Sequence, residues 1–343
     1  MAQDFSWGVV ATVREPADLV LAFAAHHLGL GAAEVTLFFD DPEDPGAALL
    51  EQVPGCTVHR CGEDYWQGTR RRERPALQSQ RQMLNATWTY NRTSVDWLLH
   101  IDADEFLHLP TPLGEELEAL RPGDGWLKIR NFERVWRPGT QGDTIFDGVF
   151  RKPVKDADDD LARIYGSKAR FLWNGFAGHP IGKALSATGR DFRINTHSPR
   201  AGRGTENHLP PYRTARHAAL LHFDGLTPLH WAAKTLRYAE QGDAAIDALL
   251  HPQRQAQVRH VRDACPDLRA ILDFHGDLFH LSEQEDLALS LIGALSSAKI
   301  DPEAEIARLL PGHRPRFETR HFDEMLGPEN AARLMTRVPG ASR

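Results

Sequence analysis

Apolar runs of strand length alternate with segments of helical periodicity over the first hundred residues. The run WGVVATV at 7–13 predicts a buried strand, and EVTLFFD and CTVHR predict two more. In PADLVLAFAAHHLGLG, Leu19, Phe23 and His27 recur at helical spacing, and Gly29 and Gly31 supply a stop. A short helix is expected near residues 47–52. Strands that alternate with helices predict an α/β fold with a mixed, mostly parallel sheet flanked by helices.

Later segments first continue the alternation of helices and strands and then become mainly helical. One long helix is predicted for RPALQSQRQMLNATWTYNRTS and a shorter one for LGEELEALR, and strands are predicted for WLLHI and GWLKIRNF. An exposed loop is predicted for VKDADDDLA. From about Thr227 onward the pattern is helical. We therefore expect a catalytic or binding domain over residues 1–240 and a helical C-terminal region over 241–343, which could shape access to a site or mediate self-association.

Acidic residues follow two of the predicted strands at the point where each ends. Asp40 and Asp41 come after VTLFF, and Asp102 and Asp104 come after WLLHI. Binding sites in open α/β sheets gather at the carboxyl ends of the strands. This placement predicts that both acidic pairs belong to one site.

Crowded carboxylates repel each other unless a cation compensates them. If the chain stays extended, Asp102 and Asp104 point to one face and share a hard metal ion, while Glu105 points away to orient the loop and Phe106 returns to the core. Two alternatives stay open: the carboxylates cap a turn, or His100 joins them in a zinc site.

Composition and charge narrow the possible partners. The chain has 343 residues and a net charge of −7, which argues against a general nucleic-acid binder. The basic run RRRER at 70–74 predicts either a solvated segment or a phosphate contact. The three cysteines show neither a metal-binding spacing nor a disulfide pattern, which suits a reducing compartment, so we expect a cytoplasmic protein. No segment approaches the apolar length of a membrane span, so we expect at most peripheral membrane contact. The sequence does not indicate an oligomeric state.

The segments VDWLLHIDADEFLHL and ATVREPADLVLAFAAHHLGLGAAEVTLFFDDPEDPG resemble the family 2-like glycosyltransferases, particularly the branch related to glycosyltransferase family 92. The resemblance covers about the first 110 residues well. It implies a GT-A fold with a Rossmann-like sheet, a nucleotide-sugar donor, expected to be UDP-linked, and Mn²⁺ or Mg²⁺ held against the diphosphate by Asp102 and Asp104. A glycan, a lipid-linked sugar or another hydroxyl compound would be the acceptor.

The same resemblance assigns further donor contacts. Glu15 falls on the family's Asn-Glu position, where Arg14 replaces the usual Asn. Asp40 and Asp41 fall on the acidic loop on the nucleoside side, in which Asp44 stands near the position of the family's Ser-x-Asp aspartate. His27 matches the end of the family's first helix, although its spacing with Leu19 and Phe23 also predicts a structural role.

Two later segments carry candidate contacts. In FAGHPIGKALSATGRDFRI, His179 and Lys183 lie in a Gly-rich setting that suits a phosphate or acceptor contact, with a plain β-turn as the alternative. The resemblance to GT-A enzymes makes His222, at the end of an apolar run, a candidate third metal ligand or diphosphate contact, and a core histidine is the alternative. The basic and aromatic segment HRPRFETRHFDEML near the C-terminus predicts an exposed helix approach or an acceptor contact.

The sequence does not rank the catalytic base. An inverting transferase needs a carboxylate near the acceptor hydroxyl, whereas a retaining one does not. The candidates are Glu105, Asp143, Asp147 and Asp224. A haloacid-dehalogenase-like phosphatase also uses Asp-x-Asp after a strand, and a non-catalytic nucleotide-sugar-binding protein would keep the same ligands; these two remain alternatives.

Overall fold

The computed structural model describes residues 5–70, 72–121, 123–140, 142–154, 158–202 and 207–336. The chain divides into two compact units, each assembled from three stretches of chain. Unit 1 comprises Met1–Asn131, Ile181–Leu221 and Ile300–Pro315, and unit 2 comprises Phe132–Pro180, His222–Lys299 and Arg316–Arg343. The functional division expected at residues 240 and 241 stays a prediction, because these units are defined by compactness alone.

Unit 1 is built on a mixed sheet with the strand order β6-β8-β4-β1-β2-β3. Strands β4, β1, β2 and β3 run parallel, whereas β8 pairs antiparallel with both β4 and β6, and β11 pairs with β5 and β6. The bounds are β1 Trp7–Val13, β2 Glu34–Phe39, β3 Cys56–Arg60, β4 Trp97–His100, β5 Glu105–His108, β6 Trp126–Val135, β8 Lys183–Ala187 and β11 Tyr212–His222, with β9 Phe192–Ile194 and β10 Pro199–Ala201 forming a separate antiparallel pair. Four neighbouring parallel strands bring their carboxyl ends to one edge.

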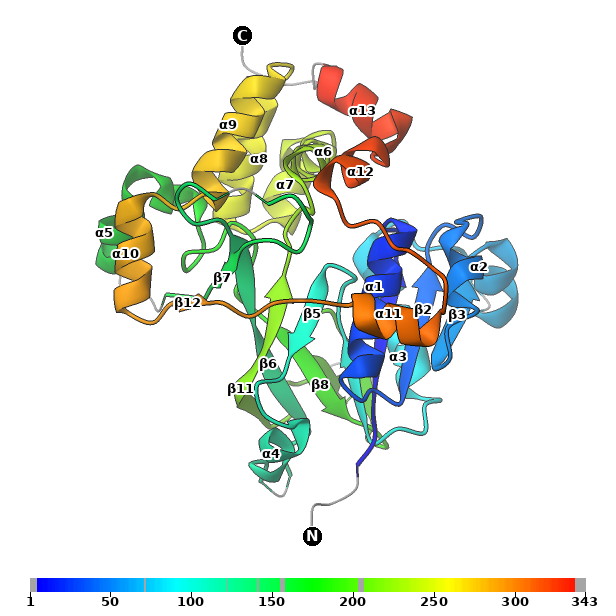
Figure 1. The fold of residues 1–343 in the computed structure, drawn as a ribbon. Helices are drawn as coiled ribbons and strands as arrows, with labels where there is room; N and C mark the ends of the chain where they lie inside the picture. The colour runs from blue at the N-terminus through cyan, green and yellow to red at the C-terminus, as the bar shows by residue number, and fades with distance from the viewer. Residues whose placement is uncertain are drawn as a thin grey trace. The chain divides into compact units, whose positions relative to one another are not determined.

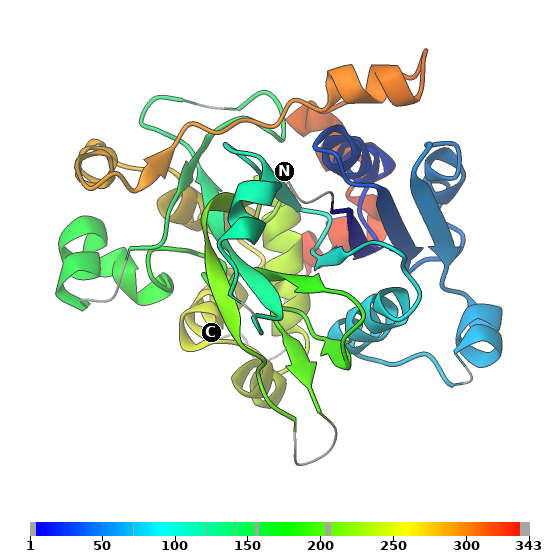
Figure 2. The ribbon, with the colours of Figure 1, turned by 90° about the horizontal axis from the view of Figure 1, so that it is seen from below.

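Helices of unit 1 flank this sheet, and Figure 2 shows α1 and α3 on opposite sides of strands β1 to β3. The bounds are α1 Ala17–Gly29, α2 Gly46–Leu50, a π-helix Tyr65–Thr69, α3 Gln78–Tyr90, α4 Leu113–Glu118 and α11 Glu303–Leu309. Helix α1 is apolar all round, since residues 19–25 are all fully buried. The sheet covers one side of α1, and α11, from far along the chain, packs on it as well.

Unit 2 starts where β6 leaves unit 1 at Phe132 and is mainly helical (Figure 1). Its elements are β7 Val149–Arg151, α5 Asp158–Tyr165, a 3₁₀-helix Gly166–Phe171, α6 Pro228–Ala239, α7 Asp243–Leu249, α8 Pro252–Ala264, α9 Leu268–Phe279, α10 Glu283–Leu291, β12 Leu295–Ser296, α12 Thr319–Glu324 and α13 Gly327–Met335. Trp231, Leu236, Val258 and Ile271 lie at the centre of its own hydrophobic core.

The predicted fold class is confirmed: helices flank a mixed sheet with a parallel core, and the chain is largely helical after Thr227. The predicted strand at 7–13 has the bounds observed for β1. The loop predicted for VKDADDDLA is wrong from Asp158 onward, where α5 begins, and residues 155–157 of this segment lie outside the described residues. Its high polarity suggested a loop, but Leu161 and Tyr165 form an apolar stripe that packs into the unit 2 core and stabilises the helix.

Candidate functional site

The first residues after three parallel strands line one cavity. Arg14 follows β1, Asp40 follows β2 and Cys61 follows β3, and all three contribute to a cavity of about 560 Å³. A cavity of this volume is in the range of small-molecule sites. The other lining residues are Asp41, Pro42, Gly62, Glu63, Trp66, Gln67, Glu73 and Arg74. The architecture therefore forms a concave site at the sheet edge where α/β folds bind ligands.

Asp40, a predicted donor contact, is held by two arginines. Arg81 donates from Nε to Oδ1 at 2.7 Å and from Nη2 to Oδ2 at 2.8 Å, and Arg74 donates from Nη2 to Oδ2 at 2.9 Å. The side chain of Arg81 is 7% exposed, whereas that of Arg74 is 46% exposed. Asp40 thus forms a buried bidentate pair with α3 and positions Arg74 on the cavity wall.

The neighbouring acidic residues shape the loop after β2. Asp41 lines the cavity and accepts a hydrogen bond from the backbone N–H of Glu43 at 3.0 Å. Asp44 accepts from the N–H of Gly46 at 2.8 Å, and burial raises the pKa of its carboxyl. These are the side-chain-to-backbone bonds expected of Asp in a turn. Glu15, also predicted to contact the donor, follows β1 and is partly buried.

The aspartates after β4 lie in a turn rather than in an extended strand. Strand β4 ends at His100, and the N–H of Glu105 donates to the carbonyl of Asp102 at 3.0 Å, which returns the chain into β5. Glu105 was expected to point away, but it is fully buried and its Oε2 accepts from the N–H of Asp102 at 3.0 Å. The turn replaces the strand's two-residue alternation, so that expectation is wrong. Phe106 is fully buried, as expected.

Lys183 lies beside this turn. It is the first residue of β8, which runs antiparallel to β4, and its Nζ contacts Asp102 Oδ2 at 2.5 Å and Glu105 Oε2 at 3.2 Å. Burial by itself lowers the pKa of this fully buried lysine, but the charges of Asp102 and Glu105 outweigh burial and raise it. Gly182 has φ +78°, and a Cβ there would lie 2.3 Å from the carbonyl oxygen of Ile129. Only glycine allows the chain to enter β8 at this point.

Helix α3 contributes a buried polar face that the sequence analysis did not identify. Besides Arg81, which holds the end of β2, Gln82 donates to Asp102 Oδ1 at 2.5 Å, and Asn85 donates to Thr12 Oγ1 at 3.0 Å. One helix therefore contacts the ends of three parallel strands. The spacing of its polar side chains was the available signal, but in sequence such a face looks like a solvated one.

Two histidines near the turn are neutral at pH 7. Burial, followed by the charge of Lys183, lowers the pKa values of His100 and His197 to about 4. His100 Nδ1 lies 3.1 Å from the carbonyl of Asn195, and His197 Nδ1 lies 3.0 Å from the carbonyl of Gly182. Among the described residues, the charged groups at the turn therefore include the carboxylates of Asp102, Asp104 and Glu105 and the ammonium of Lys183, which pairs with Asp102 and Glu105.

The donor set of the turn suits a hard divalent cation. Asp102 and Asp104 carry carboxylate oxygens, which are the ligands that hard divalent cations prefer. Among the described residues, no group of three or more His, Cys, Asp or Glu side chains is arranged to hold a metal. Mg²⁺ is commonly held by one or two carboxylates together with substrate phosphates and water. Asp102 and Asp104 therefore fit a cation that a phosphate ligand shares.

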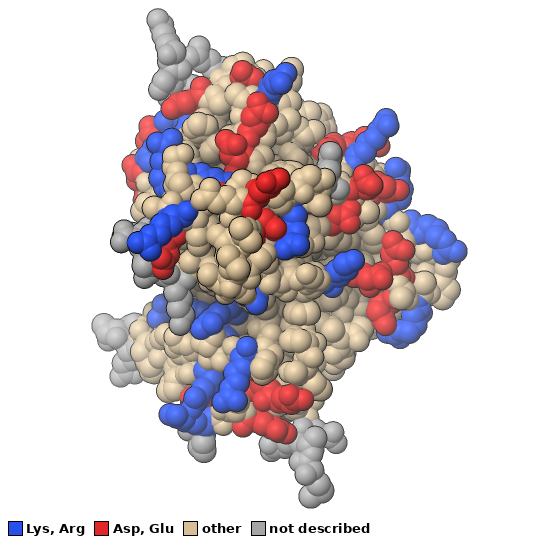
Figure 3. Space-filling model, turned by 60° about the vertical axis from the view of Figure 1, so that its left-hand side comes forward, with Lys and Arg blue, Asp and Glu red and all other residues tan. Residues whose placement is uncertain are grey.

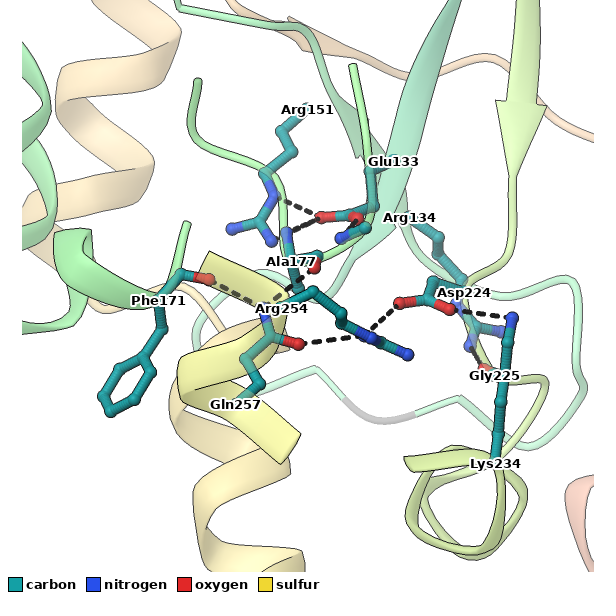
Figure 4. A network of polar contacts seen from close by, with 11 residues as sticks. Glu133, Arg134, Arg151, Phe171, Ala177, Asp224, Gly225, Lys234, Arg254 and Gln257 are labelled. Atoms are coloured by element: carbon teal, nitrogen blue, oxygen red, sulfur yellow. Dashed lines mark hydrogen bonds and ion pairs between the residues drawn. The ribbon is translucent and has the colours of Figure 1, made fainter. Parts of the chain in front are cut away.

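Unit 2 contains a buried polar network that includes the predicted site residue Asp224 (Figure 4). Glu133 is fully buried, pairs with Arg151 Nε at 2.9 Å, and accepts from the N–H groups of Ala177 and Gly178 at 2.9 and 2.6 Å. The side-chain amide of Gln257 donates to the carbonyls of Phe171 and Ala177. The loop before His179 is thus fixed by side chains at several backbone groups.

Asp224 belongs to the same network. Its Oδ1 accepts from Lys234 and its Oδ2 from Arg254, each at 3.0 Å (Figure 4). Burial alone raises the pKa of the carboxyl, but the charges of Arg254 and Lys234 reverse this and hold the pKa far below its usual range. A carboxylate that two cations stabilise is a weak proton acceptor.

His179 and His222 lie together in unit 2. Their ring centroids are 5.8 Å apart, and a Cβ on Gly178 would lie 3.0 Å from Glu133 Oε1 and 3.2 Å from His222 Cε1. The lack of a side chain at residue 178 therefore lets Glu133 and His222 approach the loop. His179 and His222 belong to unit 2, whereas Asp102, Asp104 and Lys183 belong to unit 1. The metal and phosphate roles of the two histidines stay predictions.

The two remaining candidate bases differ in their local contacts. Asp147 accepts from the N–H of Thr144 at 2.8 Å and so closes a turn. The backbone carbonyl of Asp143 accepts from the N–H of Thr319 at 2.9 Å.

The surface carries charges of both signs. On the face drawn in Figure 3, Lys and Arg side chains occur together with Asp and Glu side chains, and the acidic excess does not cover the whole face. Over the part of the chain that the structure describes, none of the helices combines the length and apolar character needed to cross a bilayer.

No protein-family model and no curated protein matches the chain. Among solved structures, HddC from Yersinia pseudotuberculosis is 6% identical with a TM-score of 0.26, over 65% of this chain and 79% of HddC. S. aureus TarS is 10% identical with a TM-score of 0.25, over 96% of this chain and 88% of that one. The complex of TarS with UDP-GlcNAc is 12% identical with a TM-score of 0.25, over 96% of this chain and 84% of the TarS chain. Likenesses with TM-scores this low carry no argument about this chain.

Proposed function

We propose that this chain is a metal-dependent glycosyltransferase with a GT-A-type fold, which transfers a sugar from a nucleotide-sugar donor, UDP-linked by the family resemblance, to a hydroxyl of a glycan or another acceptor. One observation carries the proposal. The cavity at the ends of β1, β2 and β3 and the Asp102–Asp104 turn after β4 lie at the same edge of one parallel sheet, within unit 1. A nucleoside site and a diphosphate site must be adjacent in this way.

The cavity has the chemistry that a nucleoside requires. Asp41, Glu63 and Glu73 supply acceptors for hydroxyl and N–H donors, as carboxylates do for ribose in dinucleotide sites. Arg14 and Arg74 supply cations on the same wall, where a phosphate is attracted. The buried pair of Asp40 with Arg81 keeps Arg74 in place rather than leaving Asp40 as the main ligand contact.

Mn²⁺ or Mg²⁺, when bound, would stabilise the negative charge that develops on the departing diphosphate. Asp102 and Asp104 would hold the ion, whereas the metal role of His222, which belongs to unit 2, stays a prediction. Lys183 and Gln82 keep the carboxylate of Asp102 in one orientation.

Two of the four carboxylates proposed from the sequence do not suit the role of catalytic base. Glu105 is fully buried and pairs with Lys183, so it is not accessible to an acceptor hydroxyl. Asp224 is held by Lys234 and Arg254, whose charges keep the pKa of its carboxyl far below its usual range, so it is a weak proton acceptor. We therefore assign no base.

The test combines binding and turnover. Calorimetry with UDP and other nucleotides, with and without Mn²⁺, should show binding that needs the metal, and a panel of nucleotide sugars should show Mn²⁺-stimulated donor hydrolysis. Asp102→Ala and Asp104→Ala should abolish hydrolysis while the thermal melting profile stays cooperative. Full activity in either variant would contradict the metal assignment.

Two other outcomes separate the alternatives. Nucleotide binding without turnover of any donor indicates a binding protein. Hydrolysis of p-nitrophenyl phosphate that Asp102→Ala abolishes, without nucleotide binding, indicates a phosphatase.

A further inference from the structure

We propose that Lys183 and Gln82 hold Asp102 from two sides so that the metal ion binds tightly only together with the donor diphosphate. The inference rests on the proposed function and deepens it, since it assigns Lys183 an effect on metal affinity in place of the phosphate or acceptor contact expected from the sequence.

The contacts of Asp102 fix its orientation. Oδ1 accepts from the amide of Gln82 on α3, and Oδ2 accepts from Lys183 on β8, so two separate elements of unit 1 grip one carboxylate. The side chain of Asp102 is still 31% exposed, whereas that of Lys183 is completely buried. A ligand can therefore reach Asp102 but not Lys183.

Because it is buried, Lys183 acts on a ligand only through its neighbours. Its ammonium pairs with Asp102 and Glu105 on the inner side of the turn and cancels one of the turn's negative charges. A divalent cation that enters from solvent meets a weaker attraction and also the repulsion of a fixed positive charge a few ångströms behind its ligand. Lys183 is in this sense a positioning residue that lowers the affinity of the turn for the free ion.

A nucleoside diphosphate restores the missing attraction. Its phosphate oxygens bring negative charge and additional ligands to the exposed side of Asp102, where the buried ammonium does not block them. Metal and nucleotide should therefore each increase the affinity for the other, as thermodynamic linkage requires. Without nucleotide, the site should stay largely metal-free at moderate ion concentrations.

The chain keeps Lys183 in place by backbone geometry rather than by a flexible loop. Gly182 adopts φ +78° in contact with the Ile129 carbonyl, and β8 begins at the next residue between β4 and β6. The ammonium is therefore part of the sheet, and its charge is present whether or not a ligand is bound.

The experiment measures the Mn²⁺ dissociation constant of the full chain, by electron paramagnetic resonance of free Mn²⁺, with and without UDP. In the wild type, saturating UDP should tighten Mn²⁺ binding by about tenfold or more. Lys183→Met should tighten Mn²⁺ binding without UDP by about tenfold and reduce the effect of UDP, whereas Lys183→Arg should behave as the wild type. Arg92→Met is the control, since it removes one exposed positive charge between the end of α3 and the start of β4, at the edge of the sheet where the parallel strands begin, and should leave both constants unchanged.

Lys183→Met removes one partner of a buried pair and so risks misfolding. Gln82→Glu serves as the second variant, because it keeps Lys183 and the side-chain size and adds one negative charge beside Asp102. It should also tighten Mn²⁺ binding in the absence of UDP. Equal Mn²⁺ affinity in the wild type and in the folded variants, or a wild-type affinity that UDP leaves unchanged, overturns the inference while donor turnover still supports the proposed function. A wild-type chain that binds neither Mn²⁺ nor UDP overturns both.

Discussion

Arg81→Met should destabilise unit 1 strongly, and Arg74→Met should hardly do so, although both arginines pair with the same carboxylate. Arg81 makes two hydrogen bonds to Asp40 and donates from Nη1 to the carbonyls of Pro75 and Ala76, each at 2.8 Å. Its loss leaves Asp40 buried with one exposed partner and removes the donors of two carbonyls.

The magnitudes follow from burial. Removing one partner of a buried ion pair costs about 3–5 kcal/mol, because the remaining charge stays desolvated. An exposed pair contributes about 0–1 kcal/mol. With Arg81 at 7% and Arg74 at 46% exposure, we expect losses in the free energy of unfolding of about 3–5 kcal/mol for Arg81→Met and about 1 kcal/mol or less for Arg74→Met.

Urea denaturation followed by circular dichroism gives both values, provided that the slope with urea is unchanged. Asp40→Asn, alone and combined with Arg81→Met, completes a double-mutant cycle in which the two losses should not add. Nucleotide titration supplies the functional contrast, since Arg74→Met should weaken UDP binding with little loss of stability. Equal destabilisation by Arg81→Met and Arg74→Met, or additive losses in the cycle, would refute the distinction between an anchor and a cavity residue.

Three further predictions concern the rest of the fold. Gly182→Ala should lower stability by about 2 kcal/mol or more, because alanine meets both a positive φ and the Ile129 carbonyl; an unchanged urea midpoint would contradict the close approach. Burial lowers the pKa of His275 to about 3, so below pH 6.5 the unfolded state takes up a proton that the folded state refuses, and the free energy of unfolding should fall by about 2 kcal/mol between pH 7 and pH 5 from this residue. His275→Gln should show a smaller pH slope, and an identical slope would disprove the assignment. Glu133→Gln should cost about 3–5 kcal/mol, since it leaves Arg151 buried without its counter-charge, whereas Glu51→Gln at an exposed pair serves as the control and should be nearly neutral in thermal melting.

Periodicity predicted the parts of this fold that local sequence determines. Strand β1, helix α1 and the acidic positions after β2 and β4 follow from apolar runs and from the residue at which each run ends. The position of Lys183 did not follow, because it depends on the register between β8 and β4, two strands separated by a long stretch of chain. Sequence spacing carries no information about that pairing, so a lysine predicted to touch a phosphate lies instead behind an aspartate.

Other site features were hidden because they reverse the usual pattern. Arg81, Gln82 and Asn85 look like the solvated side of a helix, yet they face the strand ends. The turn after β4 was one of the alternatives left open, and the sequence did not decide for it, since the turn depends on Glu105 folding back to the N–H of Asp102. The polar face of α3 and the turn after β4 both depend on polar groups that become buried only when the sheet has assembled.

The packing of α11 on α1 determines when the apolar surface of α1 can be buried during synthesis of the chain. Residues 303–309 cover a helix that is synthesised near the start, and Gly29 at the end of α1 lies against Glu305. During synthesis, the apolar surface of α1 that α11 covers therefore stays exposed until most of unit 2 has been translated. A truncated gene that ends at residue 240 would produce a sheet domain that lacks α11. Protection of α1 during synthesis and the choice of residues for expressing the sheet domain alone therefore both depend on this short helix.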